Sequence, residues 1–183
     1  MNLVTGYRGQ KHITSADVRK QNAMIFGDGQ VVFDTDDTFK ATVVSNNKIT
    51  IGRGALSMNG AFAKVESSQD LVIENGNQGQ YRNDLIVARY NRDAGTGIES
   101  MDLTVIKGTQ STTSAVDPTY NVGSVLDDSR NVVDMPLYRV RLNGINIDGI
   151  DTLFELAMQS RIKVVTSIPE TLGPDGTIYL VKE

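Results

Sequence analysis

Residues 38–142 repeat one pattern, in which a short run rich in apolar residues is followed by a cluster of Gly, Asn, Asp or Ser. The run at 39–44 precedes a Ser-Asn-Asn cluster at 45–47, and the run at 55–58 precedes an Asn-Gly pair. Runs of about 4–8 residues separated by turn residues are typical of antiparallel sandwiches and barrels. The sequence therefore predicts a mainly β protein built on an antiparallel β-sandwich.

Two longer runs, residues 85–90 and 100–106, predict a hairpin at the centre of the domain. The first run is apolar at nearly every position, as expected for a strand that is covered on both faces. Residues 108–131 then form a loop rich in Ser, Thr and Asp, and loops of this length are functional or packed against a neighbour. Residues 134–142 predict a further strand, and Asn143-Gly144 predicts the hairpin turn after it.

A short helix is predicted on each side of the sandwich. Thr14 can cap a helix over residues 14–27, Asp17 suits its positive end, and Gly27 is placed to end it. Residues 151–160 carry apolar residues at helical spacing and predict a second short helix. These patterns divide the chain into an N-terminal arm and helix (1–27), a β-sandwich (28–149), and a C-terminal helix with a short strand appendage (150–183).

Composition excludes several classes of function. The 183-residue chain has a net charge of −4 and scattered Lys and Arg, which argues against nucleic-acid binding. The absence of cysteine excludes disulfides, thiolate catalysis and zinc–thiolate sites. The first residues lack the features of a signal peptide, and no apolar run approaches the about 20 residues needed to span a bilayer. We expect a soluble protein made in a cytoplasm, without membrane insertion.

No motif for metal or cofactor binding is complete. The single histidine, His12, has no cysteine to join it in a zinc site. Asp34, Asp36 and Asp37 begin like a calcium loop, but the sixth and twelfth positions are not the required Gly and Glu. The glycine pairs at 27/29 and 52/54 lack the third glycine of a dinucleotide site and are better explained as turns. We expect no metal site and no cofactor.

Two groups of charged residues leave alternatives open. Glu66, Asp70 and Glu74 could supply a carboxylate pair for glycoside cleavage, although that mechanism depends on a separation that sequence does not give. The group Arg82, Asn83 and Asp84 precedes the central strand. It is either a surface turn whose Arg and Asp pair locally, which we favour, or a clamp that fixes how the strand enters the core. Neither alternative implies catalysis.

The order of segments resembles a family of bacteriophage and prophage tail proteins found in siphophages of Gram-positive bacteria. The resemblance covers about residues 1–150. It is carried by residues 4–9, 12–14, 22–29, 44–49, 73–90, 97–99, 105–108 and 134–140. The stretch from Ile73 to Tyr90 is the most specific of these. A less specific segment at 168–181 is similar to one that recurs in tail-fibre and baseplate proteins.

The resemblance implies a non-enzymatic virion component of the baseplate or tail tip. The layout is also similar to the shoulder domain of lactococcal phage receptor-binding proteins, which assemble as homotrimers and anchor to the baseplate. We therefore expect an anchoring or connector module with other tail proteins as partners. Two alternatives are a carbohydrate- or receptor-binding module that contacts a host cell-surface glycan, and a cell-wall glycan hydrolase.

Both predicted helices expose more apolar surface than an isolated short helix can tolerate, so we expect them to form the contacts of a homo-oligomer, with a trimer favoured. The candidate oligomer contacts are Val18, Met24, Ile25, Leu153 and Leu156.

Overall fold

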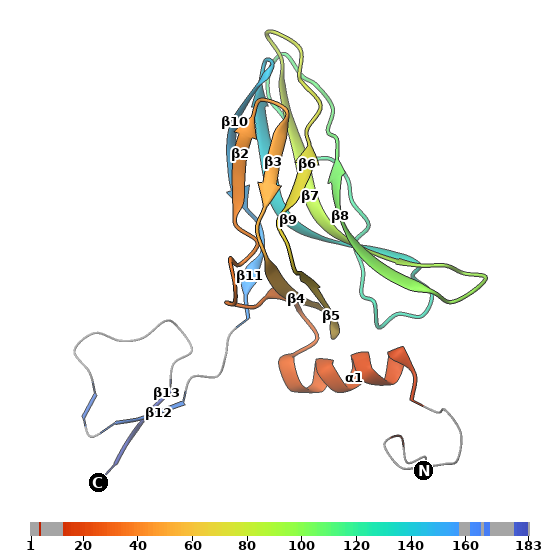
Figure 1. The fold of residues 1–183 in the computed structure, drawn as a ribbon, viewed down its shortest axis with the longest axis vertical. Coiled ribbons are helices and arrows are strands. Elements are labelled where there is room, and N and C mark those ends of the chain that lie inside the picture. Colours follow the sequence, from red (N-terminus) through yellow and green to blue (C-terminus); the bar gives the residue numbers. More distant parts are fainter. Residues whose placement is uncertain (1–3, 5–12, 158–161, 166, 169–177, 183) are drawn as a thin grey trace.

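The computed structural model describes residues 4, 13–157, 162–165, 167–168 and 178–182. The fold is mainly β, as predicted, and the described residues include one helix, at the lower end of the domain (Figure 1). Its elements are α1 (Ser15–Phe26), β1 (Gln30–Val32), β2 (Ala41–Ser45), β3 (Lys48–Ile51), β4 (Gly54–Met58), β5 (Ala61–Val65), β6 (Gln69–Val72), β7 (Tyr81–Arg92), β8 (Glu99–Ile106), β9 (Val132–Asn143), β10 (Asn146–Thr152), β11 (Glu155–Leu156), β12 (Ile162–Val165) and β13 (Ile178–Val181).

Three sheets build the domain. The long sheet has the order β10-β9-β7-β8 and is antiparallel throughout. The other two have the orders β2-β3-β6 and β11-β1-β4-β5, and both contribute to a core shared with the long sheet. Figure 1 shows β2, β3 and β6 in front of the long sheet, and β4 and β5 below them. A separate parallel pair, β12 and β13, includes the predicted final strand.

The core lies between the long sheet and the two smaller sheets. It contains Ile49 and Ile51 of β3, Leu56 and Met58 of β4, and alternate residues of β7 and β9. Alternation places the side chains of one strand face in this core, because successive residues of a strand point to opposite sides. In β3 the apolar residues Ile49 and Ile51 are therefore buried, whereas the polar residues Lys48 and Thr50 are only partly buried.

The central strand β7 is buried on both faces, as its continuous apolar sequence predicted. Ile86 and Ala88 belong to the core, whereas Leu85 and Val87 are buried on the opposite face of the sheet. The loop at 108–131 lies on that outer face. Asp117 in this loop accepts hydrogen bonds from Asn83 of β7 and Arg139 of β9. The predicted long loop therefore covers the protein's own central sheet.

The helix α1 has the predicted ends. The Thr14 hydroxyl accepts from the Asp17 amide, and the Asp17 carboxylate accepts from the Thr14 amide, which together form a capping box. Gly27 follows the helix with φ of 89°. Such a value is open to glycine and strained for other residues. Local sequence signals were sufficient to locate both ends.

The predicted helix at 151–160 is wrong over its described residues. Strand β10 continues through Gly149 to Thr152, and β11 pairs in parallel with β1. Between them the Leu153 amide donates to the Leu137 carbonyl, 3.0 Å away, and Phe154 packs edge-on against Tyr138. The apolar spacing of this segment is compatible with a helix. Instead, its backbone forms hydrogen bonds with β9 and β1, and Phe154 packs against the core. Residues 158–160 lie outside the described part of the chain.

The hairpin between β9 and β10 is confirmed, but its turn is shifted by one residue from the predicted pair. Asn143 pairs with Asn146, so the two loop residues are Gly144 and Ile145. Gly144 has φ of 61°. A glycine with positive φ at the first loop position is the arrangement of a type II′ turn.

Candidate functional site

One side of α1 presents apolar side chains to solvent. Met24 is 85% exposed and Ile25 is 64% exposed, and Val18 is also exposed. Val18 and Ile25 are seven residues apart and share one side of the helix, because two turns span about seven residues. The structure therefore places the three predicted α1 contacts in solvent, on an element at the end of the domain (Figure 1).

The opposite side of α1 is attached to the domain by an ion pair. Arg19 is buried, and its Nη1 donates to both carboxylate oxygens of Glu99 at 2.6 and 2.7 Å. The guanidinium also lies 6.0 Å from the ring centre of Tyr90. Burial raises the pKa of Glu99, but hydrogen bonds from Arg19, Tyr90 and Ser15 outweigh it and hold this pKa below its usual value. We call Arg19 and Glu99 the helix anchor.

A tight backbone contact adds to the helix anchor. Gly60, in the turn between β4 and β5, has φ of 88°, and a Cβ there would lie 2.1 Å from the carbonyl oxygen of Arg19. The Asn22 side chain donates to the Gly60 carbonyl at 3.0 Å. This approach is possible only without a side chain at Gly60. The position of α1 on the domain is therefore set by glycine as well as by the ion pair.

An aromatic groove adjoins the C-terminal end of α1. The rings of Phe26 and Phe62 each contact Phe33, with centroid separations of 5.6 and 6.0 Å. Phe26 and Phe62 are themselves more than half exposed. The groove beside them has a volume of about 530 Å³, and the ion pair of Lys64 and Glu66 borders it. Apolar surface therefore continues from the helix onto β5.

Leu153 and Leu156 do not join the α1 residues. Leu156 is exposed on β11, and Leu153 is half-buried in the segment before it. β11 and β5 are opposite edges of one sheet, and α1 contacts β5. The two predicted sets of oligomer contacts thus lie on different parts of the domain.

Arg82 and Asp84 form a buried clamp, so the surface alternative is wrong. Each side chain is 1% exposed, and Arg82 donates to both Asp84 oxygens at 2.7 and 2.8 Å. Arg82 also donates to the carbonyl oxygens of Glu74 and Asn75, and Asp84 accepts from the Gly108 amide. The pair thereby ties the segment before β7 and the segment after β8 to the start of β7.

Asn83 points to the other face of the strand and donates to Asp117. It therefore belongs to the contacts of the long loop rather than to the clamp.

The three acidic residues weighed for glycoside cleavage each have their own partner. Glu66 pairs with Lys64, and Glu74 pairs with Lys107. Asp70 accepts from Thr50 and pairs with Lys48. These partners lower the pKa of all three carboxyls. A general acid at neutral pH needs a raised pKa, and none of these three carboxyls has one.

The other weak motifs have structural explanations. Asp37 accepts from the amide and side chain of Arg53, and the Arg53 hydrogen bonds lower the pKa of Asp37. In the part of the chain that the structure describes, no group of three or more His, Cys, Asp or Glu residues could hold a metal ion. Gly54 faces the backbone of Phe39, where a Cβ would lie 2.7 Å from the amide nitrogen. His12 is outside the described residues.

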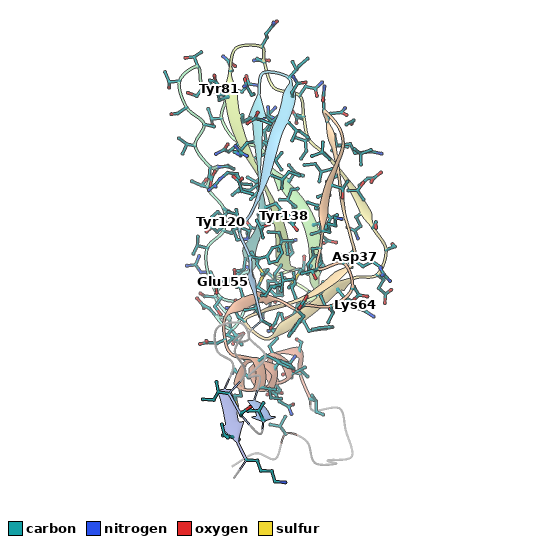
Figure 2. All side chains as sticks on the ribbon, turned by 90° about the vertical axis from the view of Figure 1, so that its left-hand side faces the viewer. Asp37, Lys64, Tyr81, Tyr120, Tyr138 and Glu155 are labelled. Atoms are coloured by element: carbon teal, nitrogen blue, oxygen red, sulfur yellow. The ribbon has the colours of Figure 1, made fainter. Side chains whose placement is uncertain are left out.

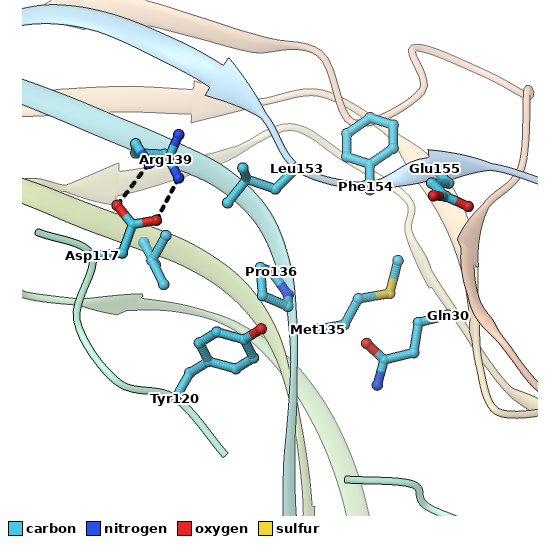
Figure 3. A pocket seen from close by; sticks show the side chains of 10 residues that line it. Gln30, Asp117, Tyr120, Met135, Pro136, Arg139, Leu153, Phe154 and Glu155 are labelled. Carbon is cyan, nitrogen blue, oxygen red and sulfur yellow. Dashed lines mark hydrogen bonds and ion pairs between the residues drawn. The ribbon is translucent and has the colours of Figure 1, made fainter. Parts of the chain in front are cut away.

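A second cavity was not predicted from the sequence. It has a volume of about 430 Å³ and lies between the long loop, β9 and the chain that leads into β11 (Figure 3). Its lining includes Tyr120, Met135, Pro136, Phe154 and Glu155. Tyr120 and Glu155 lie on the same side of the domain (Figure 2). No sequence motif could reveal this cavity, which we call the Tyr120 cavity, because five distant segments build it.

No helix among the described residues has the length and apolarity to cross a membrane. Comparison of the sequence with protein-family models and with curated proteins finds no match.

Proposed function

We propose that this chain is a non-enzymatic structural component of a phage or prophage virion. In this proposal it is an anchoring or connector module of the baseplate or tail tip and acts by homo-oligomeric assembly, with a trimer favoured. The resemblance of about residues 1–150 to phage and prophage tail proteins supports the virion role. The observation that carries the assembly role is the exposed apolar side of α1, held in place by the helix anchor.

The physical argument concerns a helix with two different sides. A helix of 12 residues is marginal alone in water, so α1 depends on its contacts with the domain. Those contacts use Arg19 and Asn22 and leave Val18, Met24 and Ile25 in water. Removing such side chains from water is favourable, and symmetric association achieves this without any new sequence.

The free energy gained by burying the exposed apolar residues of α1 alone does not offset the cost of association. Covering three partly exposed side chains gains about 1–2 kcal/mol each, whereas association costs about 4–15 kcal/mol. Phe26 and Phe62 are the nearest additional apolar surface, at the groove beside the end of α1. We therefore assign both α1 and this groove to the assembly surface.

Light scattering of the purified chain tests the assembly. A trimer has a mass of about 60 kDa, three times the 19.9 kDa chain. Met24→Glu together with Ile25→Glu should return the chain to about 20 kDa. Val116→Glu is the matched control, because Val116 is 73% exposed in the long loop, far along the chain from α1. A chain that remains at 20 kDa at high concentration contradicts the assembly proposal.

The virion role has a separate test. Particles released from a lysogen that carries the gene should contain this chain by mass spectrometry, and an antibody against it should label the tail end in electron micrographs. Particles that lack the chain contradict the virion role, whatever its oligomeric state.

A further inference from the structure

The Tyr120 cavity combines an apolar floor with a polar rim. Met135, Pro136 and Leu153 supply apolar atoms, and the side chains of Gln30, Tyr120 and Glu155 supply polar ones (Figure 3). A volume of about 430 Å³ lies within the range of small-molecule sites, which are mostly apolar with a few placed polar groups. The cavity therefore has the size and character of a ligand site.

The contacts that hold the walls of the cavity in place do not involve the polar side chains of its rim. A β-bulge in β9 shifts the register between Ile86 and Val87 of the facing strand, and bulges of this kind re-aim side chains. The Leu137 carbonyl at the bulge accepts from the Leu153 amide, which fixes the segment that carries Phe154 and Glu155. The site is thus preformed on two sheets.

Three polar groups on the rim are open. Within the described residues, the Tyr120 hydroxyl and the Glu155 carboxylate make no hydrogen bond or ion pair, and the Gln30 carboxamide makes only one long bond, to the Gly123 carbonyl at 3.4 Å. The Glu155 carboxylate and the carboxamide oxygen of Gln30 are acceptors, and a tyrosine hydroxyl can donate or accept. The rim therefore suits a ligand that offers several hydrogen-bond donors.

The charged side chains that line the cavity also restrict the charge of its ligand. Arg139 is the cation in the lining, and its guanidinium is already paired with Asp117 and Asp151. Two carboxylates, those of Asp117 and Glu155, stand against this one guanidinium, so an anionic ligand would meet repulsion. This balance disfavours phosphates, sulfates and acidic sugars, and leaves neutral and cationic ligands.

The aromatic ring of Tyr120 lines the cavity, whereas the ring of Phe154 packs against Tyr138. Aromatic rings carry negative charge on their faces and attract the slightly positive C–H groups of a neighbouring ring. A pyranose offers such C–H groups on its faces and hydroxyl donors around its edge. From these observations we infer that the Tyr120 cavity binds a neutral sugar unit, exposed at the end or edge of a glycan.

This inference does not rest on the proposed assembly, because one chain builds the cavity and α1 takes no part in it. Binding of one sugar unit should be weak, in the millimolar range, because such a small ligand makes few contacts. The test is titration of the isotope-labelled full chain with glucose, galactose, rhamnose and N-acetylglucosamine, followed by two-dimensional NMR. At least one of these sugars should shift the resonances of residues that line the cavity.

Variants connect the shifts to the rim. Tyr120→Ala should weaken binding about tenfold, and Tyr120→Phe should weaken it less, because it keeps the ring. Glu155→Gln should also weaken binding while leaving the shape of the cavity intact. Tyr81→Ala is the matched control, because Tyr81 is 41% exposed and Tyr120 is 40% exposed, and Tyr81 lies outside the cavity. Denaturant unfolding of each variant separates lost binding from lost folding.

Three results would overturn the inference. The first is that none of the four sugars shifts these resonances up to its solubility. The second is that binding is unchanged in both Tyr120→Ala and Glu155→Gln. The third is that n-butylamine, an analogue of a lysine side chain, binds where the sugars do not, which would assign the cavity to a cationic protein partner.

Discussion

Arg19 and Glu99 lie 80 residues apart in sequence, yet one guanidinium nitrogen of Arg19 reaches both carboxylate oxygens of Glu99. This contact joins the only helix among the described residues to the hairpin of β7 and β8. The Nε of Arg19 is buried and has no hydrogen-bond partner within the described residues, so the arginine depends strongly on Glu99.

Arg19→Met should loosen α1. The substitution keeps an apolar stem but leaves the carboxylate of Glu99 without its cation, and Glu99 is only 23% exposed. Loss of the pair should lower the free energy of unfolding by about 1–3 kcal/mol. Urea unfolding measures this loss, and hydrogen exchange should increase selectively in residues 15–26. Unchanged exchange in α1 would show that Gly60 and Asn22 hold the helix without the ion pair.

Acid should release α1 before it unfolds the sheets. The pKa of Glu99 is held below its usual value of 4.5, so the folded state binds fewer protons than the unfolded state as pH falls. The stabilisation is complete above about pH 4.5 and is lost as pH falls through the lowered pKa. Hydrogen exchange of α1 as a function of pH measures it. In Glu99→Gln the acid-dependent increase should be smaller, and an identical pH profile would assign it to other carboxyls.

Arg82→Met should be among the most destabilising substitutions in the domain. It leaves Asp84 buried without its partner, and breaking a buried ion pair costs about 3–5 kcal/mol. Replacing both residues, as Arg82→Met with Asp84→Leu, should recover part of this loss because no unpaired charge then remains. Chemical unfolding of the two single variants and the double variant gives the coupling energy. Additive losses would argue against the clamp.

Gly60→Ala should be more destabilising than Gly144→Ala. Both glycines have positive φ, which costs about 1–2 kcal/mol for a residue with a Cβ. At Gly60 the new Cβ would also lie 2.1 Å from the Arg19 carbonyl, whereas at Gly144 the nearest atom is 3.8 Å away. Thermal unfolding of both variants isolates the effect of the helix contact. Equal losses would show that α1 can move away without penalty.

Much of the fold could be read from local patterns. The strands predicted at 85–90, 100–106 and 134–142 lie within β7, β8 and β9, because their apolar runs suit strands. The capping box of Thr14 and Asp17 located α1. The segment at 151–157 was mispredicted as helix because its apolar spacing fits either structure, and the two neighbouring sheets decided between them.

The candidate sites depended on distant contacts. Arg82 and Asp84 were recognised as a pair, but their burial depends on the carbonyls of Glu74 and Asn75 and the amide of Gly108. Met24 and Ile25 are exposed among the described residues, and their role as oligomer contacts stays a prediction. The Tyr120 cavity had no local signal, because its residues come from β1, β7, the long loop, β9 and the β11 segment.

The sequence by itself determined the β-rich architecture, the positions of most strands and the ends of α1, because these follow from side-chain alternation and from residues that favour turns and caps. Only the tertiary structure decided which charged residues are buried, where α1 is fastened and where a cavity opens. Those features depend on pairs such as Arg19 and Glu99, whose separation in space is not encoded by any short stretch of chain.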